Sequence, residues 1–256
     1  MTRYFKGLYM SFGMFCAIPQ PFLLWDERAK NLVLPYFPLV GGFIGALWWG
    51  VAKLLFLGGI HTMLATAVVA IAPFVISGFL HLDGFMDTSD AILSRRPLKE
   101  RQRILKDPHI SAFAAIMLGV LFVLQFAAVY VVMEQGIDLK LLIVIPVISR
   151  CLCSLSILCL GPMTQSRYGN MFRKNTKVSH KVFIASIAAL GIALSCYLGQ
   201  LGGLIVAISV VACFGVAIGL AYRNMKGVSG DLAGFALVIG ELSGLVAMAA
   251  ALRGQQ

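Results

Sequence analysis

Charged residues are scarce in this sequence. Only 12% of its 256 residues are Asp, Glu, Lys or Arg, whereas soluble domains contain about 25%. Hydrophobic residues make up 59% of the chain, and the mean hydropathy is +0.89. This scarcity of charge excludes an ordinary soluble protein, and the composition predicts an integral membrane protein.

The sequence also lacks a strong internal repeat and a low-complexity linker. Without a repeat, the inverted-repeat architecture of many transporters is not indicated. Without a linker, we expect residues 1–256 to form a single membrane-embedded domain. The six cysteines lie in apolar segments, and the thiols of Cys151 and Cys153 would point about 160° apart on a helix. Neither a disulfide framework nor a zinc site is therefore expected.

Long apolar runs account for most of the chain, and each is close to the roughly 20 residues that a bilayer core requires. The expected spans cover residues 36–57, 62–80, 110–133, 139–160, 182–200, 203–221 and 232–252. The shorter apolar segment 4–18 carries basic residues and is expected to form an interfacial or re-entrant helix. The predicted fold is therefore all-α, a polytopic integral membrane helical bundle with about seven transmembrane helices.

Basic residues are concentrated in alternate connections between these spans. The connections 81–109 and 161–181 and the one that follows residue 221 hold most of them, whereas 58–61, 134–140 and 199–203 hold few. By the positive-inside rule the basic connections face the cytoplasm. The net charge of +10 is then explained by this topology and by contact with anionic lipid, and no nucleic-acid partner is expected.

Three aspartates follow the second expected span. If their segment is helical, Asp83, Asp87 and Asp90 lie within an arc of about 60° on one face. Like charges this close repel one another unless a cation lies among them, and a divalent metal such as Mg²⁺ is a suitable one. The spacing therefore predicts a metal site.

The remaining acids strengthen this interpretation. Asp107 and Asp231 also fall at expected cytoplasmic helix ends, beside the basic connections. Carboxylates for a metal and Arg or Lys for phosphate are what phosphoryl transfer requires. Asp231 lies among glycines that leave backbone amides open to an anion. An ordinary helix N-cap at Ser229 or Asp231 is by itself the more common use of such residues.

Two charged residues are expected inside the membrane. Glu241 lies about 15 Å deeper than Asp231 by helical rise, and Arg150 falls at a similar depth on another span. The two could pair with each other. A direct catalytic role is an equal alternative, because ionisable residues within a membrane are often functional.

The sequence resembles the cobalamin synthase family of adenosylcobinamide-GDP ribazoletransferases over most of its length. Residues 78–90 read GFLHLDGFMDTSD, followed by SRRP at 94–97 and ILKD at 104–107. The run around HLDG is highly specific, and the flanking pieces are weaker. Further likeness lies in Ile18-Pro19, in FPLVG at 37–41, in Arg150 and in the late acidic element up to Glu241.

The resemblance implies an enzyme of the bacterial inner membrane whose active site faces the cytoplasm. It would join adenosylcobinamide-GDP to α-ribazole or α-ribazole 5'-phosphate and release GMP, with Mg²⁺ as cofactor. Asp83, Asp87 and Asp231 are the expected Mg²⁺ ligands, with Asp90 at the rim of the same site. Asp90 is the candidate base for the attacking hydroxyl, and Asp83 could exchange roles with it.

The expected substrate-binding residues are mostly basic. Arg95, Arg96 and Lys106 would hold phosphates. The full expected set is Arg95, Arg96, Lys106, Asp107, His81, Arg150 and Glu241. Whether the protein forms an oligomer stays open.

Two other functions are considered. The CDP-alcohol phosphotransferases perform analogous chemistry with aspartates on membrane helices, but their D-G-x-x-A-R core is absent, because Met86 and Asp87 follow Gly84-Phe85. A cation transporter would be expected to place its acids near the bilayer midplane. The acids here crowd one membrane face beside anion-binding groups, which favours the transferase.

Overall fold

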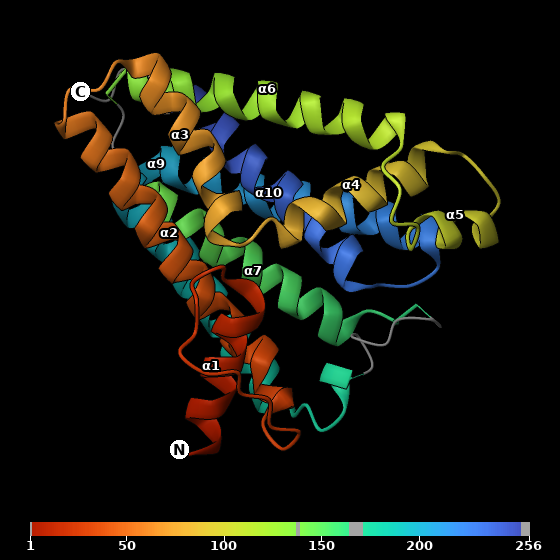
Figure 1. Ribbon diagram of the computed structural model, residues 1–256. Helices are drawn as coiled ribbons and strands as arrows, with labels where there is room; N and C mark the ends of the chain where they lie inside the picture. Colours follow the sequence, from red (N-terminus) through yellow and green to blue (C-terminus); the bar gives the residue numbers. More distant parts are fainter. Residues whose placement is uncertain (1, 137–138, 164–170, 252–256) are drawn as a thin grey trace.

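The computed structural model describes residues 2–136, 139–163 and 171–251 (Figure 1), and within these ranges the regular structure is helical. The expected all-α class is confirmed. The elements are α1 (Arg3–Phe15), η1 (Lys30–Leu32), α2 (Val33–Leu57), α3 (Thr62–Ile76), α4 (Leu80–Leu93), α5 (Leu98–Ile104), α6 (Ala112–Glu134), α7 (Leu141–Cys159), α9 (Val178–Met225) and α10 (Gly230–Ala251).

Among the described residues, five helical segments are long and apolar enough to cross a membrane. They are α2 with the preceding η1 turn, α6, α7, α9 and α10. The bent pair of α3 and α4 makes a sixth if it counts as one span. A multi-pass membrane protein is thereby confirmed, whereas the number of seven spans stays a prediction.

Helix α9 is the longest element and contains a sharp turn. Its 48 residues would extend about 72 Å if straight, more than twice the roughly 30 Å of a bilayer core. The helical geometry breaks at Gln200, and Ser195 Oγ donates a hydrogen bond to the carbonyl of Gly203 at 2.8 Å. In a continuous helix these residues would lie about 12 Å apart along the axis. The two halves match the expected spans 182–200 and 203–221.

The break between α3 and α4 corrects one expected span. Helix α3 ends at Ile76 rather than residue 80, because Gly78 and Phe79 both adopt positive φ angles, 66° and 60°. A bend of 91° separates α3 from α4, and α4 then runs toward α5 (Figure 1). Glycine suits the positive φ at residue 78, because it has no Cβ to clash with the backbone. This bend directs the helix that carries the three aspartates.

The interior of the bundle is built around α10 and α7. Helix α10 packs against α9, α4, α7 and α6, while α7 also packs against α2, and α10 lies centrally in Figure 1. Large apolar side chains on the outer faces of α6 and α9 stay exposed, among them Ile116, Val123, Leu190 and Val216. Such faces suit contact with lipid, where apolar surface need not be buried by protein.

Two short helices are also present. The segment expected at 4–18 forms α1, which packs on α2. Its interfacial or re-entrant placement stays a prediction. The polar segment after residue 97 forms the short helix α5.

Candidate active site

The three aspartates of α4 line one cavity. Asp83, Asp87 and Asp90 face a space of about 370 Å³ that is closed on its other side by residues 104–110 and by Ala114 of α6. The predicted placement of all three on one helix face is therefore confirmed. The spacing of four and three residues produces it, because residues so spaced lie one above another on a helix.

Asp231 joins these aspartates through a close crossing of α4 and α10. A Cβ added at Gly84 would lie 2.9 Å from both Cα and the carbonyl oxygen of Asp231, and one at Gly234 would lie 3.5 Å from Cα of His81. As the α4 number falls from 84 to 81, the α10 number rises from 231 to 234, so the helices run antiparallel at this contact. Glycines on both helices allow the backbones to approach.

The carboxylates form one electrostatic cluster. Asp87 is partly buried, and its carboxylate interacts with the negative charges of Asp83, Asp90 and Asp231. Lys106 lies close enough to act on Asp231 with the opposite sign. A cluster of four acids with one nearby ammonium group still favours an additional cation.

Ser229 begins α10 as an N-cap. Its Oγ accepts a hydrogen bond from the backbone N–H of Leu232 at 3.4 Å and donates to Asp231 Oδ2 at 3.3 Å. The N-cap alternative is thus confirmed for Ser229, while Asp231 occupies the first turn of the helix, where the helix dipole favours a carboxylate. The cap fixes the side chain of Asp231 beside the cluster.

The donor set suits magnesium. Oxygen ligands from carboxylates are what Mg²⁺ prefers, and it is typically held by one or two carboxylates together with phosphates and water. Within the described residues, no group of three or more His, Cys, Asp and Glu side chains is gathered closely enough to hold an ion. A metal ion held by these carboxylates would therefore need further ligands from outside the described side chains.

Lys106 and Asp107 both line the aspartate cavity. His109 Nδ1 lies 2.6 Å from Asp107 Oδ1, and the His109 backbone N–H donates to the same oxygen at 3.0 Å. These contacts lower the pKa of Asp107, because they stabilise its ionised form. His109 lines the same cavity.

Arg95 and Arg96 lie outside the cavity that Lys106 lines. Both are exposed in the turn between α4 and α5, and neither lines the aspartate cavity. Their expected role in holding phosphates stays a prediction.

Arg150 and Glu241 form a buried ion pair between α7 and α10. Ser149 Oγ donates to the same Glu241 oxygen at 2.8 Å, and the Arg150 guanidinium lies 5.7 Å from the centre of the Phe37 ring. The exposed fractions of Arg150 and Glu241 are 1% and 6%. The pairing expected from their matched depth is confirmed, and a role in substrate binding stays a prediction.

A second cavity lies beside the aspartate cluster. It has a volume of about 330 Å³ and is mostly apolar. Its lining residues are Met14, Phe15, Leu34, Phe37, Leu80, His81, Cys153, Ile157, Phe172, Gly230 and Asp231. Asp231 is shared by this lining and the aspartate cluster, so the two regions adjoin at the start of α10.

Comparison with known proteins identifies the family. A family model described as cobalamin-5-phosphate synthase matches residues 7–249. The chain belongs to the cobalamin-5-phosphate synthase family.

The similar proteins carry one name, adenosylcobinamide-GDP ribazoletransferase. One from Clostridium botulinum is 39% identical over 246 residues, covering 96% of this chain and 97% of that protein. One from Clostridium perfringens is 32% identical, with 96% and 98% covered. One from Pseudomonas putida is 34% identical over 223 residues, with 87% and 89% covered. No solved structure matches.

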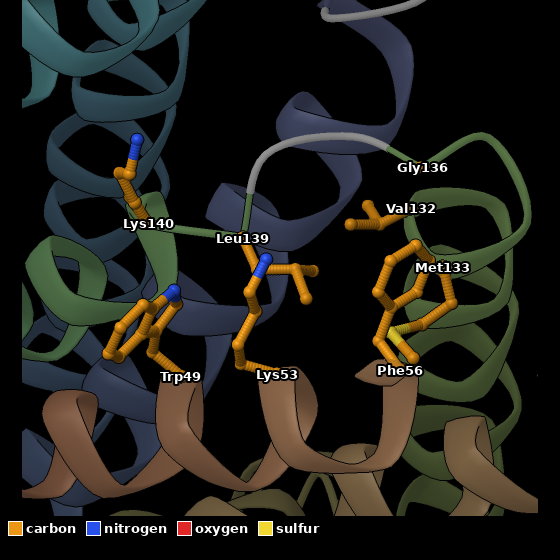
Figure 2. Close-up of a pocket in the computed structure, with 8 residues that line it drawn as sticks. All are labelled: Trp49, Lys53, Phe56, Val132, Met133, Gly136, Leu139 and Lys140. Atoms are coloured by element: carbon orange, nitrogen blue, oxygen red, sulfur yellow. The ribbon is translucent and has the colours of Figure 1, made fainter. Parts of the chain in front are cut away.

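This cobalamin-5-phosphate synthase family member has another cavity, of about 320 Å³, at the other end of the bundle (Figure 2). Met133 in its lining and Ala114 at the aspartate cavity are separated by 19 residues of α6, about 28 Å along the helix. Lys53 and Lys140 provide its charge, and none of the described residues that line it is a carboxylate. The four clustered aspartates therefore lie far from this cavity.

Sequence reasoning missed the apolar wall of the second cavity. Met14, Phe15 and Phe172 come from segments far apart in the chain, and an aromatic or Met residue in an apolar run is ordinary core material. Phe37 lies in the run FPLVG that carried part of the resemblance. Leu80 and His81 lie in the run at 78–90, so both runs carried a signal for this cavity.

Proposed function

We propose that this protein is an adenosylcobinamide-GDP ribazoletransferase that assembles the nucleotide loop of cobalamin. Membership of the family and the shared name of its relatives support this function. The structural observation that carries it is the gathering of four aspartates from α4 and α10 next to Lys106. Such a cluster suits the binding of a metal and a diphosphate.

In the proposed reaction, a ribose hydroxyl of α-ribazole or its 5'-phosphate attacks the phosphorus that carries cobinamide. A new phosphorus–oxygen bond forms, the bond to the GMP oxygen breaks, and GMP leaves. Asp90 takes the proton of the attacking hydroxyl, with Asp83 as the alternative base. Lys106 offsets negative charge on the phosphates.

Asp83, Asp87 and Asp231, with Asp90 at the rim, are the proposed residues for holding Mg²⁺. A bound Mg²⁺ would supply charge neutralisation on the diphosphate and the departing GMP. Arg95 and Arg96, exposed at the end of α4, are proposed to attract the anionic substrate as it approaches. We place the site at the cytoplasmic face of a bacterial inner membrane, because the basic connections lie at this end of the bundle.

Reconstituted protein tests this function. The purified chain in lipid nanodiscs, supplied with adenosylcobinamide-GDP, α-ribazole 5'-phosphate and Mg²⁺, is expected to release GMP and form the complete corrinoid. Chelation of Mg²⁺ should stop GMP release. The Lys53→Gln variant, altered in the other cavity, serves as the control and should match the wild type.

The alternatives predict other outcomes. A phospholipid product from a CDP-alcohol and no corrinoid would support the CDP-alcohol phosphotransferase. Ion flux into liposomes with no release of GMP would contradict the transferase and support a transporter.

A further inference from the structure

The second cavity contains an unusual polar group. His81 is 94% buried, and its Nε2 has no hydrogen-bond partner among the described residues. Its ring lies 5.5 Å from that of Phe37 and 6.2 Å from that of Phe15, centre to centre. A buried polar atom without a partner destabilises a fold, so this nitrogen suggests a missing partner within the cavity.

His81 does not belong to the aspartate cavity. It precedes Asp83 by two residues, so the two side chains lie about 160° apart around α4. The cavity linings agree with this, because His81 lines the apolar cavity and Asp83 the acidic one. The two cavities therefore flank α4, with Asp231 contributing to both regions.

We propose that the apolar cavity binds the planar base of the ribazole nucleoside, with His81 Nε2 donating a hydrogen bond to the free ring nitrogen of that base. This inference rests on the proposed function. The base of ribazole is a dimethylbenzimidazole, a flat apolar bicycle with one unsubstituted ring nitrogen. The cavity offers the matching surface, with Phe15, Phe37 and Phe172 around a single orphaned ring nitrogen.

The other substrate base suits this cavity poorly. Guanine has several donors and acceptors on its edges, and each one buried without a partner is unfavourable. Apart from His81 and Asp231, the described side chains that line the cavity are apolar or a thiol. The cavity volume of about 330 Å³ lies at the lower end of the roughly 300 to 1,000 Å³ typical of small-molecule sites.

The position of the cavity also places the ribose. With the base beside His81, the sugar extends past Gly230 and Asp231, which form the part of the lining nearest the aspartates. The attacking hydroxyl then reaches the aspartates from the start of α10, whereas Lys106 lies in the connection that follows α5. The cavity thus accounts for selection of the acceptor, a task that the aspartates cannot perform.

A substrate analogue tests the hydrogen bond directly. In the indole analogue of α-ribazole, a C–H group replaces the free ring nitrogen and the shape is retained. The wild type should use α-ribazole about tenfold better than this analogue by kcat/KM, since one hydrogen bond is worth roughly that factor. In His81→Phe the ratio should fall to near one, and His81→Asn, which keeps an N–H donor, should restore part of it.

A cavity-filling variant provides a second test that does not depend on His81. Cys153→Phe should raise KM for α-ribazole at least tenfold while KM for adenosylcobinamide-GDP stays unchanged. Binding of α-ribazole alone, measured by calorimetry in nanodiscs, should weaken in parallel. The Trp49→Phe variant, in the other cavity (Figure 2), should leave both KM values and the ratio unchanged.

The outcomes separate the two proposals. If the wild type releases no GMP, the proposed function fails. If it turns over but His81→Phe keeps the tenfold ratio, or Cys153→Phe leaves KM for α-ribazole unchanged, the base site is refuted while the function stands. A cavity filled by a lipid tail would give this last result.

Discussion

Asp87 is the acid most surrounded by other acids, since it interacts with Asp83, Asp90 and Asp231. Each of these carboxylates is tolerated on its own, but together they favour a bound cation. The charge of Asp87, rather than its shape, should therefore carry its function.

We expect Asp87→Asn to lower kcat at least about 100-fold, with Asp83→Asn behaving in the same way. The isosteric amide keeps the packing and removes the charge that would hold Mg²⁺. The measurement is GMP release in nanodiscs, with expression and circular dichroism as checks of folding. Glu27→Gln, on an exposed loop, is the matched control, and a near-normal rate in either aspartate variant would refute the ligand assignment.

The Arg150–Glu241 pair illustrates a different use of charge. Both side chains are buried, and each supplies the main partner of the other. Removing one partner leaves an uncompensated charge, whereas removing both leaves none.

Arg150→Leu should destabilise the protein by about 3–5 kcal/mol, as for other broken buried pairs. The double variant Arg150→Leu with Glu241→Leu should recover most of this loss, because no charge is left unpaired. Unfolding in detergent measures both free energies. A double variant as unstable as the single one would show that the pair does not act electrostatically.

At the scale of elements, the crossing of α4 and α10 assembles the site from two distant segments. Gly84 and Gly234 form the contact surface, and the N-cap at Ser229 fixes where α10 begins. Small residues at such crossings let backbones approach closely.

We expect Gly84→Ala to separate the two helices and to lower both the midpoint of thermal unfolding and kcat. Its Cβ would meet backbone atoms of Asp231 at 2.9 Å, and backbone cannot rotate away as a side chain can. Gly119→Ala on α6 is the control, because nothing lies within 4 Å of its Cβ position. Equal effects of the two substitutions would contradict the close crossing.

The turn within α9 also depends on a glycine. A Cβ at Gly203 would lie 1.8 Å from the carbonyl oxygen of Ser195. Gly203→Ala should therefore lower the free energy of unfolding by about 1–3 kcal/mol, the usual effect of overpacking. Gly215→Ala is the control and should leave the free energy of unfolding nearly unchanged, because a Cβ there meets open space. If α9 were straight, neither substitution would change the free energy of unfolding.

At the scale of the whole molecule, the aspartate cluster lies at one end of the helical bundle, and a cavity with two lysines lies at the other. The four clustered aspartates and Lys106 lie near the starts of α6 and α10, and the cavity of Figure 2, with Lys53 and Lys140, lies toward the other end of α6. This polarity predicts the orientation in the membrane.

A membrane-impermeant maleimide tests that orientation in intact cells. Ile60→Cys, between α2 and α3, should be labelled from outside, whereas Arg96→Cys should be labelled only after permeabilisation. Both positions are exposed. The wild type, with its own free cysteines, corrects for background. Labelling of Arg96→Cys from outside would invert the proposed topology.

Hydropathy and helical spacing determine how much of this protein could be predicted from the sequence. Long apolar runs are sufficient to indicate helices in a membrane, and the spacing of Asp83, Asp87 and Asp90 places them on one face wherever the helix lies. The helix expected over 62–80 ends at Ile76 instead, because the left-handed turn at Gly78 and Phe79 interrupts an apolar run without changing its composition. Hydropathy averages over such a turn.

The sequence alone determined a helical membrane protein with an acidic helix face beside basic connections, because periodicity and hydropathy are properties of neighbouring residues. Only the tertiary structure decided that Asp231 packs on Gly84 and that His81 faces an aromatic cavity. It also decided between the two alternatives for Arg150 and Glu241, whose matched depth had indicated a pair but not excluded separate roles. Gly84 and Asp231 are 147 positions apart, and His81 is 44 and 66 positions from Phe37 and Phe15. Such partners are chosen by the packing of whole helices, which no local pattern encodes.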